Sequence, residues 1–204
     1  TAASAARRSS RQWRAGAAAL GGAGFAAVFL RRARSVPSVL PAALLTRILQ
    51  AAATAFRIAL DAEVTVEVNP GTVDAAALAG LRDAGVNRLS IGVQSFDDVE
   101  LRLLWRIHDR QRALDTLSAA RAAGFDNLSL DLIFGLPTQS MTSWKASLQA
   151  ALSVGVQHLS LYALTLEEGT PLARQIRAGG LPAPDDDLAA DMYLYAEDCL
   201  EQAG

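Results

Sequence analysis

A six-residue pattern occurs three times in this chain and constrains the fold more than any other feature. Each copy reads glycine, apolar residue, two polar residues, Leu-Ser, in Gly85–Ser90, Gly124–Ser129 and Gly155–Ser160. Glycine can end a helix in the left-handed conformation, the apolar residue after it packs back on the helix, and Leu-Ser then opens a buried strand. The three glycines are 39 and 31 positions apart, enough for a strand and a helix each. The repeat predicts parallel β/α architecture, either a barrel or an open doubly wound sheet.

Hydrophobic periodicity places the other elements around these copies. Four strands are expected, at Val64–Asn69, Arg88–Val93, Asn127–Phe134 and His158–Leu164. Six helices are expected, at Pro41–Leu60, Val73–Ala84, Asp97–Trp105, Arg110–Ala123, Met141–Ser153 and Asp186–Gln202. Strand and helix therefore alternate from the first strand onward.

The charges are unevenly distributed along the 204 residues. Residues 1–60 contain nine arginines and no acidic residue, whereas all 21 acidic residues follow. The well-patterned part is acidic and would repel a phosphate backbone, so nucleic-acid binding is not expected. With 51% hydrophobic and 20% charged residues the chain is expected to fold. The single cysteine excludes a disulfide framework and fits a reducing, cytoplasmic location.

Residues 1–36 are interpreted as a separate, unassigned segment. They are rich in Ala, Arg, Gly and Ser without helical or strand periodicity, which favours disordered or out-of-frame sequence. A targeting signal is the alternative, because Arg7-Arg8 precede an uncharged run over Ala15–Leu30. This run is shorter than the about 20 apolar residues of a membrane span, so membrane insertion is not expected.

Each predicted strand carries one polar face. The polar residues at alternating positions are Thr65, Glu67 and Asn69, then Ser90 and Gln94, then Ser129 and Asp131, then His158, Ser160 and Tyr162. Burying an unpaired carboxylate costs several kcal/mol, so Glu67 and Asp131 should meet polar partners, water or a ligand. A buried hydrogen-bond network without a ligand is the alternative. Glu67, Gln94 and Asp131 lie toward the C-terminal strand ends, where β/α proteins bind ligands.

Other catalytic patterns are missing from the sequence. His108 and His158 are isolated, and no Ser-His-Asp arrangement, P-loop or GxGxxG motif occurs. An ordinary β/α-barrel enzyme that uses Glu67 and Asp131 as an acid/base pair remains an alternative.

Four motifs, in this order, resemble the radical S-adenosylmethionine (SAM) family of oxygen-independent coproporphyrinogen III oxidases. They are Glu67–Thr72 (EVNPGT), Asn87–Phe96 (NRLSIGVQSF), Asp131–Pro137 (DLIFGLP) and Leu159–Tyr162 (LSLY). The HemW-type haem-chaperone branch is the more similar one, especially at Asn69–Thr72 and Arg106–His108. The resemblance covers residues 37–204 and implies a partial parallel (β/α)6 barrel, incomplete at the N-terminus, with the family's C-terminal domain missing.

The resemblance also implies cofactors and binding residues. The family's barrel holds SAM against a [4Fe-4S] cluster. Glu67 would contact the SAM at the cluster, while Gln94, Arg106 and Asp131 match residues that line the cofactor cavity. Carboxylates can accept hydrogen bonds from ribose hydroxyls or an ammonium, and an arginine fork suits a methionine carboxylate.

Three departures from the family pattern stand out. The CxxxCxxC motif that ligates the cluster is absent and is expected upstream of Thr1. Ala33–Ser38 stands where the family has the SAM-binding GGGTPS segment. Trp105 stands where relatives usually have glycine.

Besides the acid/base enzyme, three functions are compatible with the sequence. The parent protein is expected to be a haem chaperone that delivers haem to an acceptor protein. The first alternative is an oxidase that decarboxylates the propionates of coproporphyrinogen III to vinyl groups. The second is a fragment without its cluster that carries out no chemistry, so enzymatic activity stays open.

Overall fold

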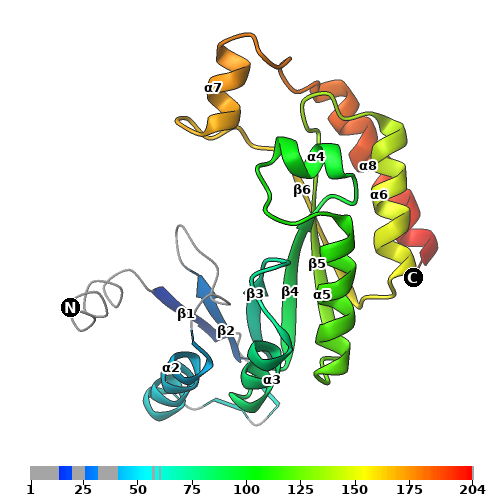
Figure 1. The fold of residues 1–204 in the computed structure, drawn as a ribbon. Helices are drawn as coiled ribbons and strands as arrows, with labels where there is room; N and C mark the ends of the chain where they lie inside the picture. Colours follow the sequence, from blue (N-terminus) through cyan, green and yellow to red (C-terminus); the bar gives the residue numbers. More distant parts are fainter. Residues whose placement is uncertain (1–13, 20–25, 32–40, 57, 60, 204) are drawn as a thin grey trace. The chain divides into compact units, whose positions relative to one another are not determined.

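The computed structural model describes residues 14–19, 26–31, 41–56, 58–59 and 61–203 (Figure 1). Its chain divides into two compact units. The first comprises Thr1–Gly92 and Leu114–Leu128, and the second comprises Val93–Ala113 and Ser129–Gly204.

The strands of the first unit pair in chain order. They are β1 (Arg14–Ala19), β2 (Ala26–Arg31), β3 (Val64–Val68) and the larger part of β4 (Arg88–Gln94). Strands β1 and β2 are antiparallel, β2 and β3 are parallel, and so are β3 and β4, where Glu67 is opposite Ser90. The sequence pattern did not predict β1 and β2, because neither the Ala-rich β1 nor the mostly apolar β2 alternates polar and apolar residues. The remaining positions of residues 1–36 lie outside the described residues.

Helices α2 (Ala42–Ala55) and α3 (Ala75–Asp83) belong to the first unit, which also holds most of α5 (Arg110–Ala122). Helix α3 begins at Asp74, whose carboxylate accepts a hydrogen bond from the Ala77 amide at 2.8 Å. Its Leu78 and Leu81 are buried in the core. The Asn87 side chain accepts from the Val64 amide at 2.7 Å and donates to the Ala62 carbonyl at 2.8 Å, which ties the starts of β3 and β4 together.

The second unit contains a parallel strand pair and four helices. Strand β5 (Asn127–Phe134), most of which lies in this unit, pairs with β6 (His158–Ala163), and Asp131 is opposite Ser160. The helices are α4 (Asp98–Leu103), α6 (Met141–Ser153), α7 (Pro171–Arg177) and α8 (Asp186–Ala203). Helix α6 packs beside α8 in Figure 1.

The glycines of the repeat adopt the conformation that the sequence predicts. Gly85, Gly124 and Gly155 have φ angles of 94°, 84° and 68°. Nothing lies within 4 Å of where a Cβ would stand at Gly85 and Gly155, so glycine is required there by the backbone angle alone. The predicted parallel strands alternating with helices are confirmed in β3, β4, β5 and β6.

Helix α7 is the one helix of the described residues that the sequence pattern missed. Thr170 accepts a hydrogen bond from the Ala173 amide and Pro171 stands in the first turn, both ordinary helix-start features. Seven residues are too few for an amphipathic pattern to be recognised. Helices α2 and α4 are shorter than predicted, ending at Ala55 and Leu103.

Candidate functional site

The four residues predicted to bind the cofactor fall in different units. Glu67 lies in β3 of the first unit, is half-buried and has polar or charged partners. Gln94, Arg106 and Asp131 lie in the second unit. The predicted polar face of β5 is present, because Ser129 is fully buried and Asp131 is half-buried between buried leucines.

Gln94 ends β4 in an unusual backbone conformation. Its φ angle is 71°, in the left-handed region that favours glycine, and its side chain is only 8% exposed. A non-glycine residue in this region costs about 1–2 kcal/mol and persists only where its surroundings hold it. The binding role of Gln94 stays a prediction, and its backbone conformation shows that the end of β4 is held by its surroundings.

Arg106 and Asp131 form an electrostatic pair within the second unit. Burial lowers the pKa of the Arg106 guanidinium from its usual value, and the nearby Asp131 carboxylate partly offsets this effect. The Arg106 amide donates to the Leu101 carbonyl at 2.9 Å, just past the end of α4. Trp105, directly before it, has a φ angle of 55°, in the left-handed region that favours glycine. The structure thus brings two of the predicted residues together.

His108 is buried beside this pair and its protonation state follows from its contacts. Its Nε2 lies 3.0 Å from the Val93 carbonyl oxygen, which accepts only, so Nε2 carries the proton. Nδ1 is buried and has no hydrogen-bond partner among the described residues. The pKa of His108 is lowered by burial, raised by the Val93 hydrogen bond, lowered by the Arg106 charge and raised by Asp109, with a net decrease. His108 is therefore neutral at pH 7.

The lowered pKa of His108 predicts a pH dependence of stability. As pH falls below about 6.5, the unfolded chain takes up a proton at this histidine before the folded chain does. The free energy of unfolding should therefore decrease from pH 6.5 toward pH 5, and His108→Gln should reduce this slope. Urea unfolding at several pH values measures it. His158→Gln, at an exposed position of β6, is the matched control. An unchanged slope in His108→Gln would contradict the assignment.

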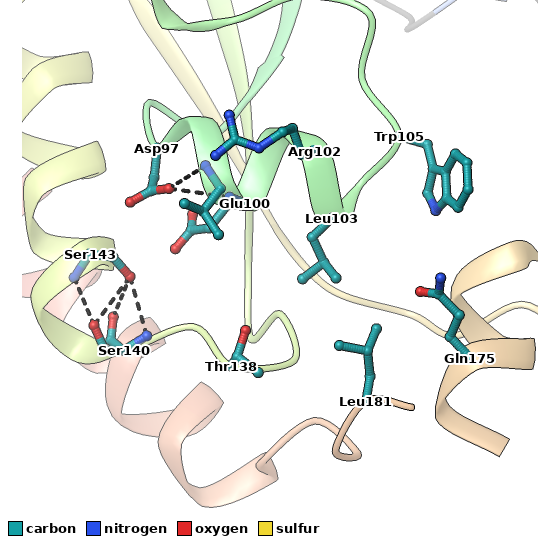
Figure 2. Close-up of a pocket in the computed structure, with 11 residues that line it drawn as sticks. Asp97, Glu100, Arg102, Leu103, Trp105, Thr138, Ser140, Ser143, Gln175 and Leu181 are labelled. Atoms are coloured by element: carbon teal, nitrogen blue, oxygen red, sulfur yellow. Dashed lines mark hydrogen bonds between the residues drawn. The ribbon is translucent and has the colours of Figure 1, made fainter. Parts of the chain in front are cut away.

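A pocket of about 600 Å³ lies in the second unit (Figure 2). Its volume suits a small-molecule ligand. It is lined by residues of α4, the β5–α6 connection, and α7 with the segment that follows it: Asp97, Val99, Glu100, Arg102, Leu103, Trp105, Thr138, Ser140, Ser143, Gln175 and Leu181. None of the four predicted cofactor residues lines it. Apart from the unusual Trp105, no sequence pattern predicted this pocket, because residues from separate segments of the chain form its wall.

The residues of this chain suit SAM but not the cluster. Carboxylates, an amide and a half-buried guanidinium are the groups that bind ribose hydroxyls, an ammonium and a carboxylate. A [4Fe-4S] cluster needs several cysteine thiolates, and this chain has only Cys199, on α8. Among the described residues no group of three His, Cys, Asp or Glu side chains could hold a metal ion. The segment Ala33–Ser38, which stands in place of GGGTPS, lies outside the described residues.

Comparison with known proteins identifies the family of this chain. Residues 37–151 match the family model of the radical SAM superfamily. A mitochondrial radical S-adenosyl methionine domain-containing protein 1 from Bos taurus is 44% identical over 181 residues, 86% of this chain and 41% of the relative. The heme chaperone HemW of Synechocystis is 41% identical over 168 residues, 82% of this chain and 41% of the relative.

A solved structure shows the same fold. The coproporphyrinogen III oxidase HemN from Escherichia coli, a radical SAM enzyme, superimposes with a TM-score of 0.72 at 31% identity, covering 83% of this chain and 39% of HemN. The chain belongs to the radical SAM superfamily. Within the superfamily it is HemN/HemW-like, and the predicted partial barrel is confirmed.

The chain spans about two fifths of the length of these relatives. In the described part of the chain, no helix is both long and apolar enough to cross a membrane.

Proposed function

We propose that this chain is the SAM-binding part of a haem chaperone of the HemW type. The observation that carries the proposal is the 41% identity to the Synechocystis heme chaperone over 168 residues. The half-buried Arg106 and Asp131, which interact electrostatically, and the buried Gln94 support it, because these groups suit an amino-acid cofactor. The intact protein would bind haem and deliver it to an acceptor protein.

In this proposal each residue has a task toward SAM. The Arg106 guanidinium would bind the methionine carboxylate, while Asp131 and Glu67 would accept hydrogen bonds from ribose hydroxyls or the ammonium. Gln94, fixed at the end of β4, would orient one end of the cofactor. SAM on a reduced [4Fe-4S] cluster supplies radical chemistry. The ligating cysteines would come from a segment upstream of Thr1, and a cytoplasmic location is proposed, although a vertebrate relative is mitochondrial.

A second candidate is a coproporphyrinogen III oxidase, which the structural match to HemN favours. The two activities differ in what happens to the tetrapyrrole. A chaperone binds haem and leaves it unchanged, whereas the oxidase converts propionate side chains to vinyl groups with release of carbon dioxide.

One experiment separates these functions. The product of the complete gene is prepared anaerobically with iron and sulfide, then titrated with haem and, separately, incubated with coproporphyrinogen III and SAM. We expect a saturable change in the haem absorbance spectrum and no decarboxylated product. Formation of that product would establish the oxidase instead. A protein that binds neither haem nor iron would support the inactive alternative.

A further inference from the structure

Four polar side chains form a buried network next to Gln94. Ser95, Glu100, Gln139 and Ser147 are between 1% and 6% exposed, and all four lie in the second unit. They come from the β4–α4 turn, α4, the β5–α6 connection and α6. Buried polar groups of this kind are costly unless they are hydrogen-bonded, so their pairing is informative.

The direction of each hydrogen bond follows from the donors available. Glu100 Oε2 accepts from Ser95 Oγ at 2.5 Å and from Gln139 Nε2 at 3.1 Å. Because Ser95 has one hydroxyl proton and gives it to Glu100, the 3.3 Å contact between Ser95 and Ser147 must have Ser147 as donor. The donations therefore converge on Glu100.

The network also holds backbone on both sides of Glu100. After β4, the Asp97 amide donates to Ser95 Oγ at 2.9 Å and the Phe96 amide donates to Ser147 Oγ at 3.2 Å. After β5, the Leu136 amide donates to the Gln139 side chain at 3.1 Å. Glu100 is thus the acceptor that joins the turn after β4 to the turn after β5.

We propose that Glu100 is a positioning residue for Gln94, an inference that rests on the proposed SAM-binding function. Gln94 directly precedes Ser95 and has a φ angle of 71°, a conformation that its surroundings must maintain. The convergence of Ser95 and Gln139 on one carboxylate fixes the turn that begins at Gln94. In this proposal Glu100 acts on SAM binding through the geometry of the loop that begins at Gln94.

Glu100→Gln tests this with little change in shape. Glu100 Oε1 is buried and has no hydrogen-bond partner among the described residues. If the glutamine amide nitrogen takes the place of Oε1, it is a buried donor without an acceptor. If it takes the place of Oε2, it faces the donors of Ser95 and Gln139 and displaces them. Hydrogen exchange of the Phe96, Asp97 and Leu136 amides should then become at least about fivefold faster. The dissociation constant for radiolabelled SAM, measured by equilibrium dialysis, should rise about three- to tenfold.

The double variant with Gln94→Ala separates positioning from general stability. If Glu100 acts through Gln94, Glu100→Gln should weaken SAM binding in the parent chain and add nothing once Gln94 is alanine. Ser95→Ala should reproduce the effect of Glu100→Gln and replaces it if that variant does not fold. Glu197→Gln, exposed on α8, is the control and should change neither readout.

The outcomes are distinct. Faster exchange with weaker SAM binding that depends on Gln94 supports the proposal. Unchanged exchange, unchanged SAM binding, or the same weakening in the Gln94→Ala background overturns it. If the unsubstituted chain binds no SAM, the proposed function fails and with it the role of Glu100 in binding, while the exchange rates still report whether Glu100 holds the two turns.

Discussion

Asp131→Asn is expected to weaken SAM binding by about ten- to a hundredfold, the range given by losing a hydrogen bond to a charged group. The asparagine keeps the shape of the side chain but removes the negative charge. That charge supports Arg106 against the effect of burial and, in the proposed function, receives cofactor donors. Equilibrium dialysis of the chain against radiolabelled SAM measures the change.

Two further variants make the Asp131 result specific. Asp126→Asn changes an exposed aspartate just before β5 and should leave the dissociation constant unchanged. Arg106→Lys keeps the charge but loses the two-pronged geometry that suits a carboxylate, and should also weaken binding. Equal affinity of Asp131→Asn and the unsubstituted chain would remove Asp131 from the binding site.

Trp144→Ala is expected to lower the free energy of unfolding by about 3–5 kcal/mol, the range for a large aromatic residue in a core. Trp144 is 1% exposed in α6 and its ring lies 5.4 Å from that of Phe134 in β5. Its Nε1 donates to the Met192 carbonyl of α8 at 2.9 Å. The substitution therefore leaves a cavity and removes this hydrogen bond, and urea unfolding followed by circular dichroism measures the decrease in the free energy of unfolding.

Two further variants separate the contributions that the ring and the hydrogen bond of Trp144 make to the free energy of unfolding. Trp144→Phe keeps most of the ring but loses the hydrogen bond to Met192, and should cost less than Trp144→Ala. Trp105→Ala removes a tryptophan that is 64% exposed and should cost under about 1 kcal/mol. A loss below 1 kcal/mol for Trp144→Ala would show that α6 does not depend on this contact.

Local sequence signals predicted most of the second unit. Strand β5 and helix α6 have the predicted bounds, since the alternating apolar residues of β5 and the Ser140 cap of α6 are encoded locally. Helix α7 was missed because its start depends on a threonine and a proline over a single short segment. Strands β1 and β2 show no polar–apolar alternation, and their pairing with each other and of β2 with β3 defines them.

The polar residues of the candidate site could be predicted from the sequence, but the buried hydrogen-bond network around Glu100 could not. Alternation along β5 placed Asp131 on a polar face, and the structure adds its electrostatic contact with Arg106. The binding roles of Glu67, Gln94, Arg106 and Asp131 remain predictions. Glu100 was missed because an acidic residue in the first turn of a helix normally interacts with the helix dipole at the surface. Only its hydrogen bonds to Ser95 and Gln139, from separate segments, reveal a buried carboxylate.

The central claim is that this chain supplies the SAM-binding residues of a protein whose cluster cysteines precede Thr1. Sequencing the gene upstream of and across the codons for Thr1–Ser38, and translating all three frames, tests it most directly. We predict a CxxxCxxC motif followed by a GGGTPS-like segment, in the frame of this chain or a neighbouring one. The lack of both motifs in every frame would contradict cluster chemistry, and the polar residues of β3, β4 and β5 would then require another ligand.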